Sequence, residues 1–215
     1  MTGGLGKQSK TLSDAQLKRL LAFVKTETGF PERNAVIVQL SFRAGLRSKE
    51  IACLTWEMCV DEGIVGGKDC ELEVRNVTSK GKRGGRRIPM NEELRIALVE
   101  LYELEKEKDD DERGTATAFV VTLARATSVK ARAASVAFLM NGNRGQQGWF
   151  AKLGFEGVTS HAGRRTFLTK AARMVSSVGG SLKDVMELAG HSSLQMTARY
   201  IDENAEAKRK LVSKM

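Results

Sequence analysis

The sequence contains two histidines, and each lies near a residue that could act on an anion. His161 stands three residues before Arg164 in HAGRRT, a spacing that places two side chains on one face of a helix. The two side chains make a poor core pair, because both can carry positive charge and burial of either is costly. Together they could hold an anion, since a guanidinium binds two oxygens and an imidazole donates or accepts a proton. A purely structural histidine is the alternative.

The second histidine, His191, lies in AGHSSLQMTARY, nine residues before Tyr200. Gly190 is expected to end one helix and Ser192 to cap the next, so His191 occupies a turn near a helix N-terminus, where anions bind readily. A tyrosine at the end of a helix is usually a surface or packing residue. This segment alone therefore leaves open whether Tyr200 is a nucleophile.

Two further segments place cations where they could bind phosphate. Arg47 follows Gly45 at the expected start of a helix, where it could bind an anion or pair with Glu50. The segment from Arg75 to Arg87 holds six basic residues and no acidic one, and it contains Lys80 in the turn TSKGKRGGR. A basic hairpin is suited to a DNA groove, and a solvated loop is the alternative.

The charge pattern favours a polyanionic partner. The net charge is +9, and residues 114–155 contain no acidic residue. The same stretch could form one wall of a DNA channel, with a basic surface as the alternative. Its basic residues are Arg125, Lys130, Arg132, Arg144 and Lys152.

The elements that must position these residues are mainly helical, with one small antiparallel sheet. Apolar residues recur at helical spacing from Leu17 to Val24, after an expected capping box of Ser13 with Gln16. A second helix should begin at Pro31 and run to about Ala44. ELEVRNVT and RRIPM predict two antiparallel strands within residues 64–90. Further helices are expected from Asn91 to about Glu107 and from His161 to Val175. Ser181 with Asp184 should cap a short helix, and Ser192 with Gln195 should open another that carries Tyr200.

Length and composition suit one domain of 215 residues without a membrane anchor. No apolar run approaches the roughly 18 residues that a spanning helix needs, and MTGGLGKQSK lacks an apolar signal core. Cys53, Cys59 and Cys70 have no paired spacing, so we expect small buried residues in a reducing cytoplasm, not a disulfide frame or a zinc site.

Four segments in this order resemble the tyrosine recombinase, or phage integrase, family. RAGLRSKEIACLTW resembles the first arginine box of that family and TSKGKRGGRRIP its lysine hairpin. HAGRRTFLT resembles the His-x-x-Arg box, and LAGHSSLQMTARY the final box with the second histidine and the nucleophilic tyrosine. The family often has Leu where Ala162 and Gly163 stand, and a glycine inside a helix costs about 1 kcal/mol relative to alanine.

The resemblance implies the catalytic domain of a recombinase, with the integrase-like α+β fold. It implies cleavage of DNA through a phosphotyrosine, with no metal and no cofactor. The catalytic residues would be Arg47, Lys80, His161, Arg164, His191 and the nucleophile Tyr200, with Lys82 as the competitor of Lys80 for general acid. The expected DNA-binding residues are Lys82, Arg83, Arg86, Arg87, Arg125, Lys130, Arg132 and Arg144.

The resemblance also implies partners and a domain order. The partner is double-stranded DNA at specific sites, bound by a homotetramer whose subunits are monomers in solution, and the protein is expected in the cytoplasm at the nucleoid. Residues 1–10 would form a flexible basic arm, 11–202 the catalytic domain, and 203–215 a tail exchanged between protomers. About forty residues precede the first arginine box, too few for the separate DNA-clamping domain of most integrases, so we expect a catalytic fragment or a compact recombinase.

Two other functions fit parts of the pattern. A type IB topoisomerase shares the Arg, Lys, His and Tyr chemistry but needs no partner site. A non-catalytic DNA-binding module derived from an integrase would bind DNA without forming a covalent adduct.

Overall fold

The computed structural model describes residues 9–61, 64–65, 67, 70–75, 85–108, 118–123, 128–200, 209 and 212–213. The chain divides into two compact units, Met1–Phe167 and Leu168–Met215. The boundary falls within α7, which runs from Ala162 to Met174. Among the described residues no helix is long and apolar enough to cross a membrane.

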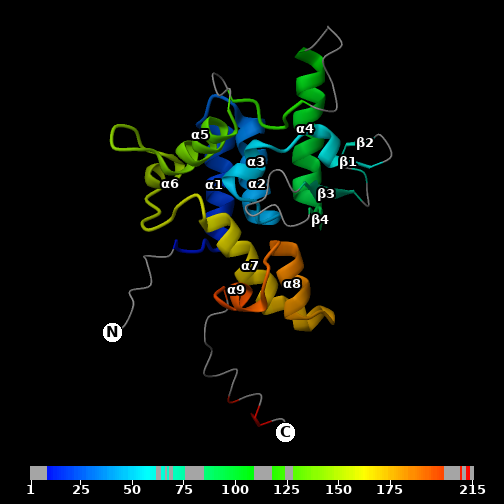
Figure 1. Cartoon of the computed structure of the whole chain (residues 1–215). Helices are drawn as coiled ribbons and strands as arrows, with labels where there is room; N and C mark the ends of the chain where they lie inside the picture. The colour runs from blue at the N-terminus through cyan, green and yellow to red at the C-terminus, as the bar shows by residue number, and fades with distance from the viewer. Residues whose placement is uncertain are drawn as a thin grey trace. The chain divides into compact units, whose positions relative to one another are not determined.

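The first unit is built mainly from helices, as the periodicity of the sequence predicts (Figure 1). Its elements are α1 (Asp14–Thr26), α2 (Pro31–Arg43), α3 (Ser48–Ala52), the 3₁₀ helix η1 (Trp56–Cys59), α4 (Glu92–Lys108), α5 (Val129–Asn141), α6 (Trp149–Lys152) and the start of α7. The mainly α architecture with a small antiparallel sheet is thereby confirmed.

The central helix of this unit is α2. Its residues 34–42 are all buried, polar members included, and the helix packs against α1, α3 and α4. Figure 1 shows α5 and α6 on one side of α2 and α3, and α4 with the strands on the other. A helix buried on every side is fixed in place, so the chain that leaves its end starts from a fixed point.

The turn after α2 depends on Gly45. Its φ of +64° lies in the left-handed region, which glycine adopts without a steric penalty, and the Leu46 amide donates to the Leu40 carbonyl at 3.1 Å. A Cβ at this position would lie 2.5 Å from Cδ1 of Phe167. The turn therefore needs glycine for its backbone and for the space beside Phe167.

The strands of the first unit form two-stranded antiparallel pairs within the described residues. The pairs are β1 (Val60–Asp61) with β2 (Ile64–Val65), and β3 (Glu71–Val74) with β4 (Arg86–Pro89). In the second pair Leu72 lies opposite Ile88, and both are buried. The antiparallel hairpin expected from ELEV and RRIP is thus confirmed.

The second unit holds the end of α7, a 3₁₀ helix η3 (Val175–Val178), α8 (Leu182–Ala189) and α9 (Leu194–Ala198). The capping box of Ser181 with Asp184 opens α8, and Gly190, with a φ of +61°, ends it as predicted. The N-cap of α9 was expected at Ser192 and lies one residue later. Ser193, not Ser192, caps α9 by accepting a hydrogen bond from the Met196 amide. Tyr200 lies two residues beyond the end of α9.

Other local predictions are confirmed in the first unit. Ser13 and Gln16 form the expected capping box of α1, and Asn91 accepts a hydrogen bond from the Leu94 amide at the start of α4. The three cysteines, Cys53, Cys59 and Cys70, are buried, as expected. Burial raises the pKa of the Cys59 thiol far above its ordinary value, and the nearby Cys70 adds to the effect.

The glycine within α7 has a packing reason. A Cβ at Gly163 would lie 2.8 Å from the backbone carbon of Ser41 in α2 and would overlap the Ser41 hydroxyl. The helix propensity lost at Gly163 is therefore offset by close approach of α7 to α2, which brings Arg164 next to the turn after α2.

We expect Gly45→Ala to lower the free energy of unfolding by about 2–3 kcal/mol, because alanine disfavours the left-handed backbone and its methyl group overlaps Phe167. Chemical denaturation measures this change. Gly29→Ala is the matched control, since Gly29 has no neighbour within 4 Å, and it should be at least as stable as the wild type. Equal stability of both variants would show that the turn tolerates a side chain.

Candidate functional site

The first candidate residue, Arg47, immediately precedes α3 and contacts Glu50. Its backbone amide donates to Glu50 Oε2 at 2.8 Å, and its Nη1 donates to Glu50 Oε1 at 3.1 Å. The Arg47 side chain keeps 27% of its surface exposed, whereas that of Glu50 keeps 1%. The pairing of Arg47 with Glu50 that the sequence left open is therefore present, and part of the Arg47 side chain remains exposed.

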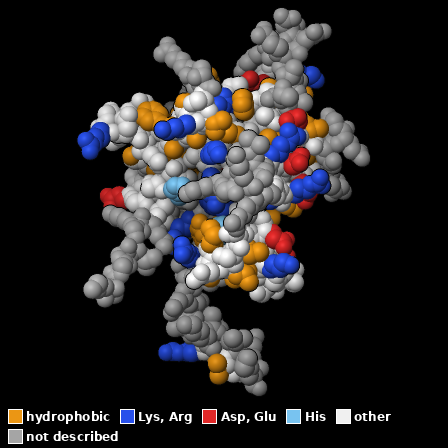
Figure 2. Space-filling model, in the orientation of Figure 1, with side chains coloured by type: hydrophobic (Ala, Val, Ile, Leu, Met, Phe, Trp, Pro, Cys, Tyr) orange, Lys and Arg blue, Asp and Glu red, His pale blue; other side chains and the backbone are white. Residues whose placement is uncertain are grey.

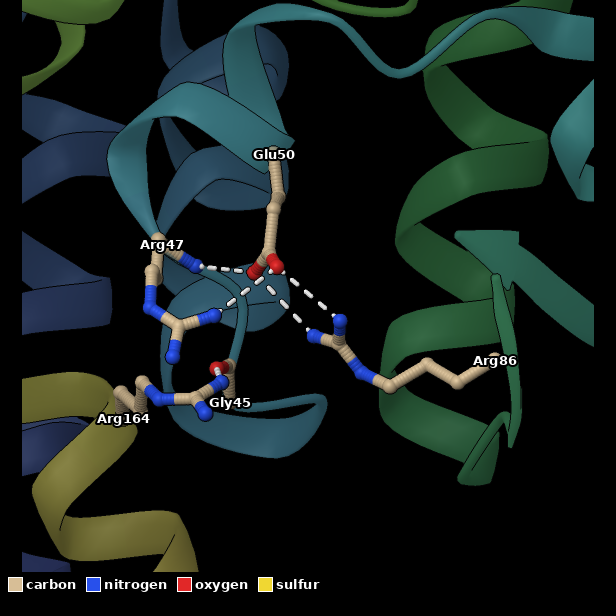
Figure 3. A network of polar contacts seen from close by, with 5 residues as sticks. All are labelled: Gly45, Arg47, Glu50, Arg86 and Arg164. Carbon is tan, nitrogen blue, oxygen red and sulfur yellow. Dashed lines mark hydrogen bonds and ion pairs between the residues drawn. The ribbon is translucent and has the colours of Figure 1, made fainter. Parts of the chain in front are cut away.

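Arg86, at the start of β4, approaches the same carboxylate from another part of the chain (Figure 3). Its Nη1 donates to Glu50 Oε1 at 2.9 Å and its Nη2 to Oε2 at 3.1 Å, and its side chain is only 9% exposed. The sequence predicted Arg86 to bind DNA from the hairpin surface. That placement is wrong, because the guanidinium turns inward to the buried charge of Glu50.

The two arginines keep Glu50 ionised. Burial of the carboxyl group opposes ionisation, but the hydrogen bonds and charges of Arg86 and Arg47 outweigh burial, so the pKa of Glu50 lies below its ordinary value. A buried carboxylate with two cationic partners is a fixed anchor for both.

Arg164 is buried in the first turns of α7 and donates from Nη1 to the Gly45 carbonyl at 2.9 Å. Its anchor thus lies two residues from Arg47, and Figure 3 draws both arginines beside the segment between α2 and α3. Arg164 is therefore hydrogen-bonded to the same short segment that carries Arg47. Such a pair can bind the two non-bridging oxygens of a phosphate.

His161 directly precedes α7 and is exposed. Its carbonyl accepts from the Arg165 amide at 3.0 Å, as expected of a residue at a helix start. The segment before it is held by Ser160, whose amide donates to Asn141 Oδ1 at 2.7 Å at the end of α5. The predicted helix from His161 therefore begins one residue later, with His161 at its entrance.

Arg132 departs most from the DNA-binding prediction. It is buried, its Nε donates to the Ala52 carbonyl at 2.9 Å, and its Nη2 donates to the Val121 carbonyl at 2.8 Å. Its guanidinium carbon lies 3.7 Å from the centroid of the Phe119 ring. The expected surface position is wrong, because these partners hold the side chain at the end of α3.

The remaining basic candidates are exposed or fall outside the described residues. Exposed are Arg87 on β4, Lys130 in the first turn of α5 and Arg144 in the loop after α5. Lys80, Lys82, Arg83 and Arg125 lie outside the described residues. Figure 2 shows Lys and Arg side chains in the middle of one face, with most visible acidic side chains of the first unit toward the α4 side.

In the second unit His191 and Tyr200 lie together. Their rings stack with centroids 5.5 Å apart and planes 22° apart. His191 is buried, and its Nδ1 lies 2.9 Å from Thr197 Oγ1. Thr169 Oγ1 donates to the Tyr200 carbonyl at 3.1 Å. The nine-residue spacing is thus bridged by a short helix that returns the chain to the histidine.

Sequence reasoning gave no site role to Glu50, Thr197 or Thr169. The three-residue spacing from Arg47 to Glu50 is a local signal for a helix-start contact. Thr197 is fully buried three residues before Tyr200, but nothing in the sequence distinguishes it from a surface threonine of α9. The Thr169 contact joins positions 31 residues apart and has no local signal.

Comparison with known proteins identifies the family. Residues 10–207 match the Phage integrase family, so the chain belongs to that family. No curated protein matches the sequence.

Several solved structures of tyrosine recombinases are similar to this chain in fold. XerA recombinase is 22% identical with a TM-score of 0.66 over 95% of this chain and 64% of that chain. The Tn1549 transposon integrase in complex with circular intermediate DNA is 22% identical with a TM-score of 0.61, over 98% and 68%. XerH recombinase bound to its difH substrate is 18% identical with a TM-score of 0.64, over 99% and 56%. The fold is that of a tyrosine recombinase catalytic domain, and the chain spans about two thirds or less of these proteins.

We expect Glu50→Gln to destabilise the fold by about 3 kcal/mol at pH 7, because Arg47 and Arg86 lose the buried counter-charge that they share. Because the pKa of Glu50 is lowered in the folded state, ionised Glu50 stabilises the fold at pH values above the ordinary pKa of a carboxyl group. This contribution is lost as the pH falls through the lowered pKa of the folded state. The difference in stability from the wild type should therefore shrink below about pH 4.

Urea denaturation from pH 3 to pH 8 measures this dependence. The control is Glu100→Gln, an exposed position on α4, which should stay within about 0.5 kcal/mol of the wild type. A Glu50→Gln difference that does not change with pH would contradict a charge effect.

We expect Arg132→Leu to lower the free energy of unfolding by about 2 kcal/mol, because the carbonyls of Ala52 and Val121 lose a buried donor. Lys130→Gln, on the exposed face of the same helix, should leave stability nearly unchanged. Thermal unfolding of the two variants separates a structural arginine from a surface lysine. An Arg132 variant as stable as the Lys130 variant would contradict the assignment.

Proposed function

We propose that the chain is the catalytic part of a site-specific recombinase that cuts and rejoins DNA through a 3′-phosphotyrosine on Tyr200. Membership of the phage integrase family and the recombinase fold support the proposal. The observation that carries it is the hydrogen bond of Arg164 to Gly45, two residues before Arg47, because two arginines at one segment suit a phosphodiester.

In the proposed reaction Arg47 and Arg164 bind the non-bridging oxygens of the scissile phosphate. They stabilise the negative charge that grows in the transition state. His191 donates a hydrogen bond to the phosphate, and the contact with Thr197 holds its ring in orientation. His161 acts as the general base or assists it, and its exposed position at the entrance to α7 leaves it accessible to substrate.

Tyr200 supplies the nucleophile. A neutral phenol is a poor nucleophile, so the reaction requires removal of its proton and an activated phosphorus. The phenolic oxygen attacks phosphorus, the bond to the 5′ oxygen breaks, and Lys80 gives that oxygen a proton. A 5′-hydroxyl from another strand then attacks the phosphotyrosine and releases Tyr200. The phosphodiester energy is conserved, so ATP is not required.

The partner in this proposal is double-stranded DNA at a specific site. The Tn1549 and XerH structures contain DNA, which supports the choice of partner. Exposed Arg87, Lys130 and Arg144 are the described candidates for contact with its backbone. Exchange of strands between two sites requires several copies, so we propose a homotetramer on DNA, formed from monomers and joined through residues 203–215.

The test is covalent capture of the protein on DNA. The protein is incubated with a nicked suicide substrate made from DNA that flanks its gene, and an SDS-stable adduct is sought. We expect an adduct with wild-type protein and none with Tyr200→Phe, although the variant should bind the same DNA. Tyr102→Phe is a matched control, because it removes a phenolic hydroxyl from a tyrosine on α4.

An adduct formed by Tyr200→Phe would overturn the nucleophile assignment. DNA binding by the wild type without any adduct, on substrates of full site length, would favour the non-catalytic DNA-binding module. Strand exchange between two sites separates a recombinase from a topoisomerase, which relaxes supercoiled DNA without a second site.

A further inference from the structure

We propose that Arg86 is a positioning residue for the reaction, which acts on Arg47 through Glu50. The inference rests on the proposed function, since it assigns Arg47 to phosphate binding. Arg86 itself does not contact DNA in this proposal. It fixes the carboxylate that orients Arg47 and balances the negative charge of that carboxylate.

Both oxygens of Glu50 are shared by the two arginines (Figure 3). Oε1 accepts from Nη1 of Arg47 and from Nη1 of Arg86, at 3.1 and 2.9 Å. Oε2 accepts from the Arg47 backbone amide and from Nη2 of Arg86, at 2.8 and 3.1 Å. A rotation of the carboxylate that breaks its contacts with Arg86 therefore also disturbs its contacts with Arg47.

The charges explain why two arginines are needed. Arg47 with Glu50 alone would form a neutral pair, and a carboxylate competes with phosphate for the same guanidinium. Arg86 supplies the counter-charge of Glu50 through a two-pronged contact, so the group of three keeps a net positive charge. Arg47 is its most exposed member, with 27% of its side chain exposed against 9% for Arg86 and 1% for Glu50. The excess positive charge is therefore accessible at Arg47.

The local structure requires an external anchor. The helix α3 has five residues, and a helix this short has little stability of its own. Arg86 lies 36 residues after Glu50 in the sequence, at the start of β4. It is next to Arg87, whose side chain is exposed. Neighbouring strand residues point to opposite faces, so one arginine turns to the carboxylate and the other to solvent. Arg87 is therefore a control of equal charge one residue away.

The first measurement is the titration of Glu50, and it needs no DNA. The carboxyl carbon is followed by ¹³C NMR and assigned by its loss in Glu50→Gln. We expect Arg86→Gln to move the titration to higher pH and Arg87→Gln to leave it in place. An unchanged titration in Arg86→Gln overturns the proposal, whether or not the protein acts on DNA.

The second measurement is the single-turnover rate of adduct formation at saturating DNA, below the unfolding temperature of every variant. We expect Arg86→Gln to be about tenfold or more slower than the wild type, because a small displacement of a catalytic group is costly. Arg86→Lys should lie between Arg86→Gln and the wild type, since it restores the charge but not the two-pronged contact.

A double variant separates action through Glu50 from direct contact with DNA. In the Glu50→Gln background, Arg86→Gln should change the rate by less than about twofold, because the carboxylate that Arg86 serves is absent. An equal loss in both backgrounds, or an Arg86→Gln rate equal to that of the wild type, would overturn the proposal. Absence of an adduct with wild-type protein would instead count against the proposed function, and the titration would still decide the Arg86 link.

Discussion

The buried carboxylate of Glu50 is the constraint on which the rest of the first unit's site depends. An ionised group with 1% exposure is stable only with cations and hydrogen bonds close to it. The chain supplies them from Arg47, immediately before α3, and from Arg86 at the start of β4, 36 residues after Glu50 in the sequence. These contacts fix the orientation of Arg47 and link the start of β4 to α3.

The elements predicted from sequence are those whose signals are local. The capping boxes of Ser13 with Gln16 and Ser181 with Asp184 involve residues three positions apart, and helix ends at Gly45 and Gly190 follow from the backbone freedom of glycine. Candidate catalytic residues were likewise recognisable from short motifs, because each motif combines residue types that serve a core poorly. Their roles remain proposals.

The predictions that failed concern the direction of basic side chains. Arg86 and Arg87 are identical in type and adjacent, and the register of β4 against β3 decides which one faces inward. Arg132 lies among exposed neighbours on α5, but its acceptors are carbonyls 80 and 11 residues away. A charge pattern along the sequence cannot reveal such distant partners, so it overestimates the number of cations available to DNA.

The burial of the Glu50 cluster also separates two effects of ionic strength. Mobile ions screen charges in solvent, but they screen a buried ion pair much less. Contacts of exposed lysines and arginines with a DNA backbone weaken steeply as salt rises, through release of counterions. Added salt therefore acts on the encounter between protein and DNA, while Arg47 and Arg86 stay bound to their shared carboxylate. A protein displaced from DNA by salt retains this preformed arrangement for the next encounter.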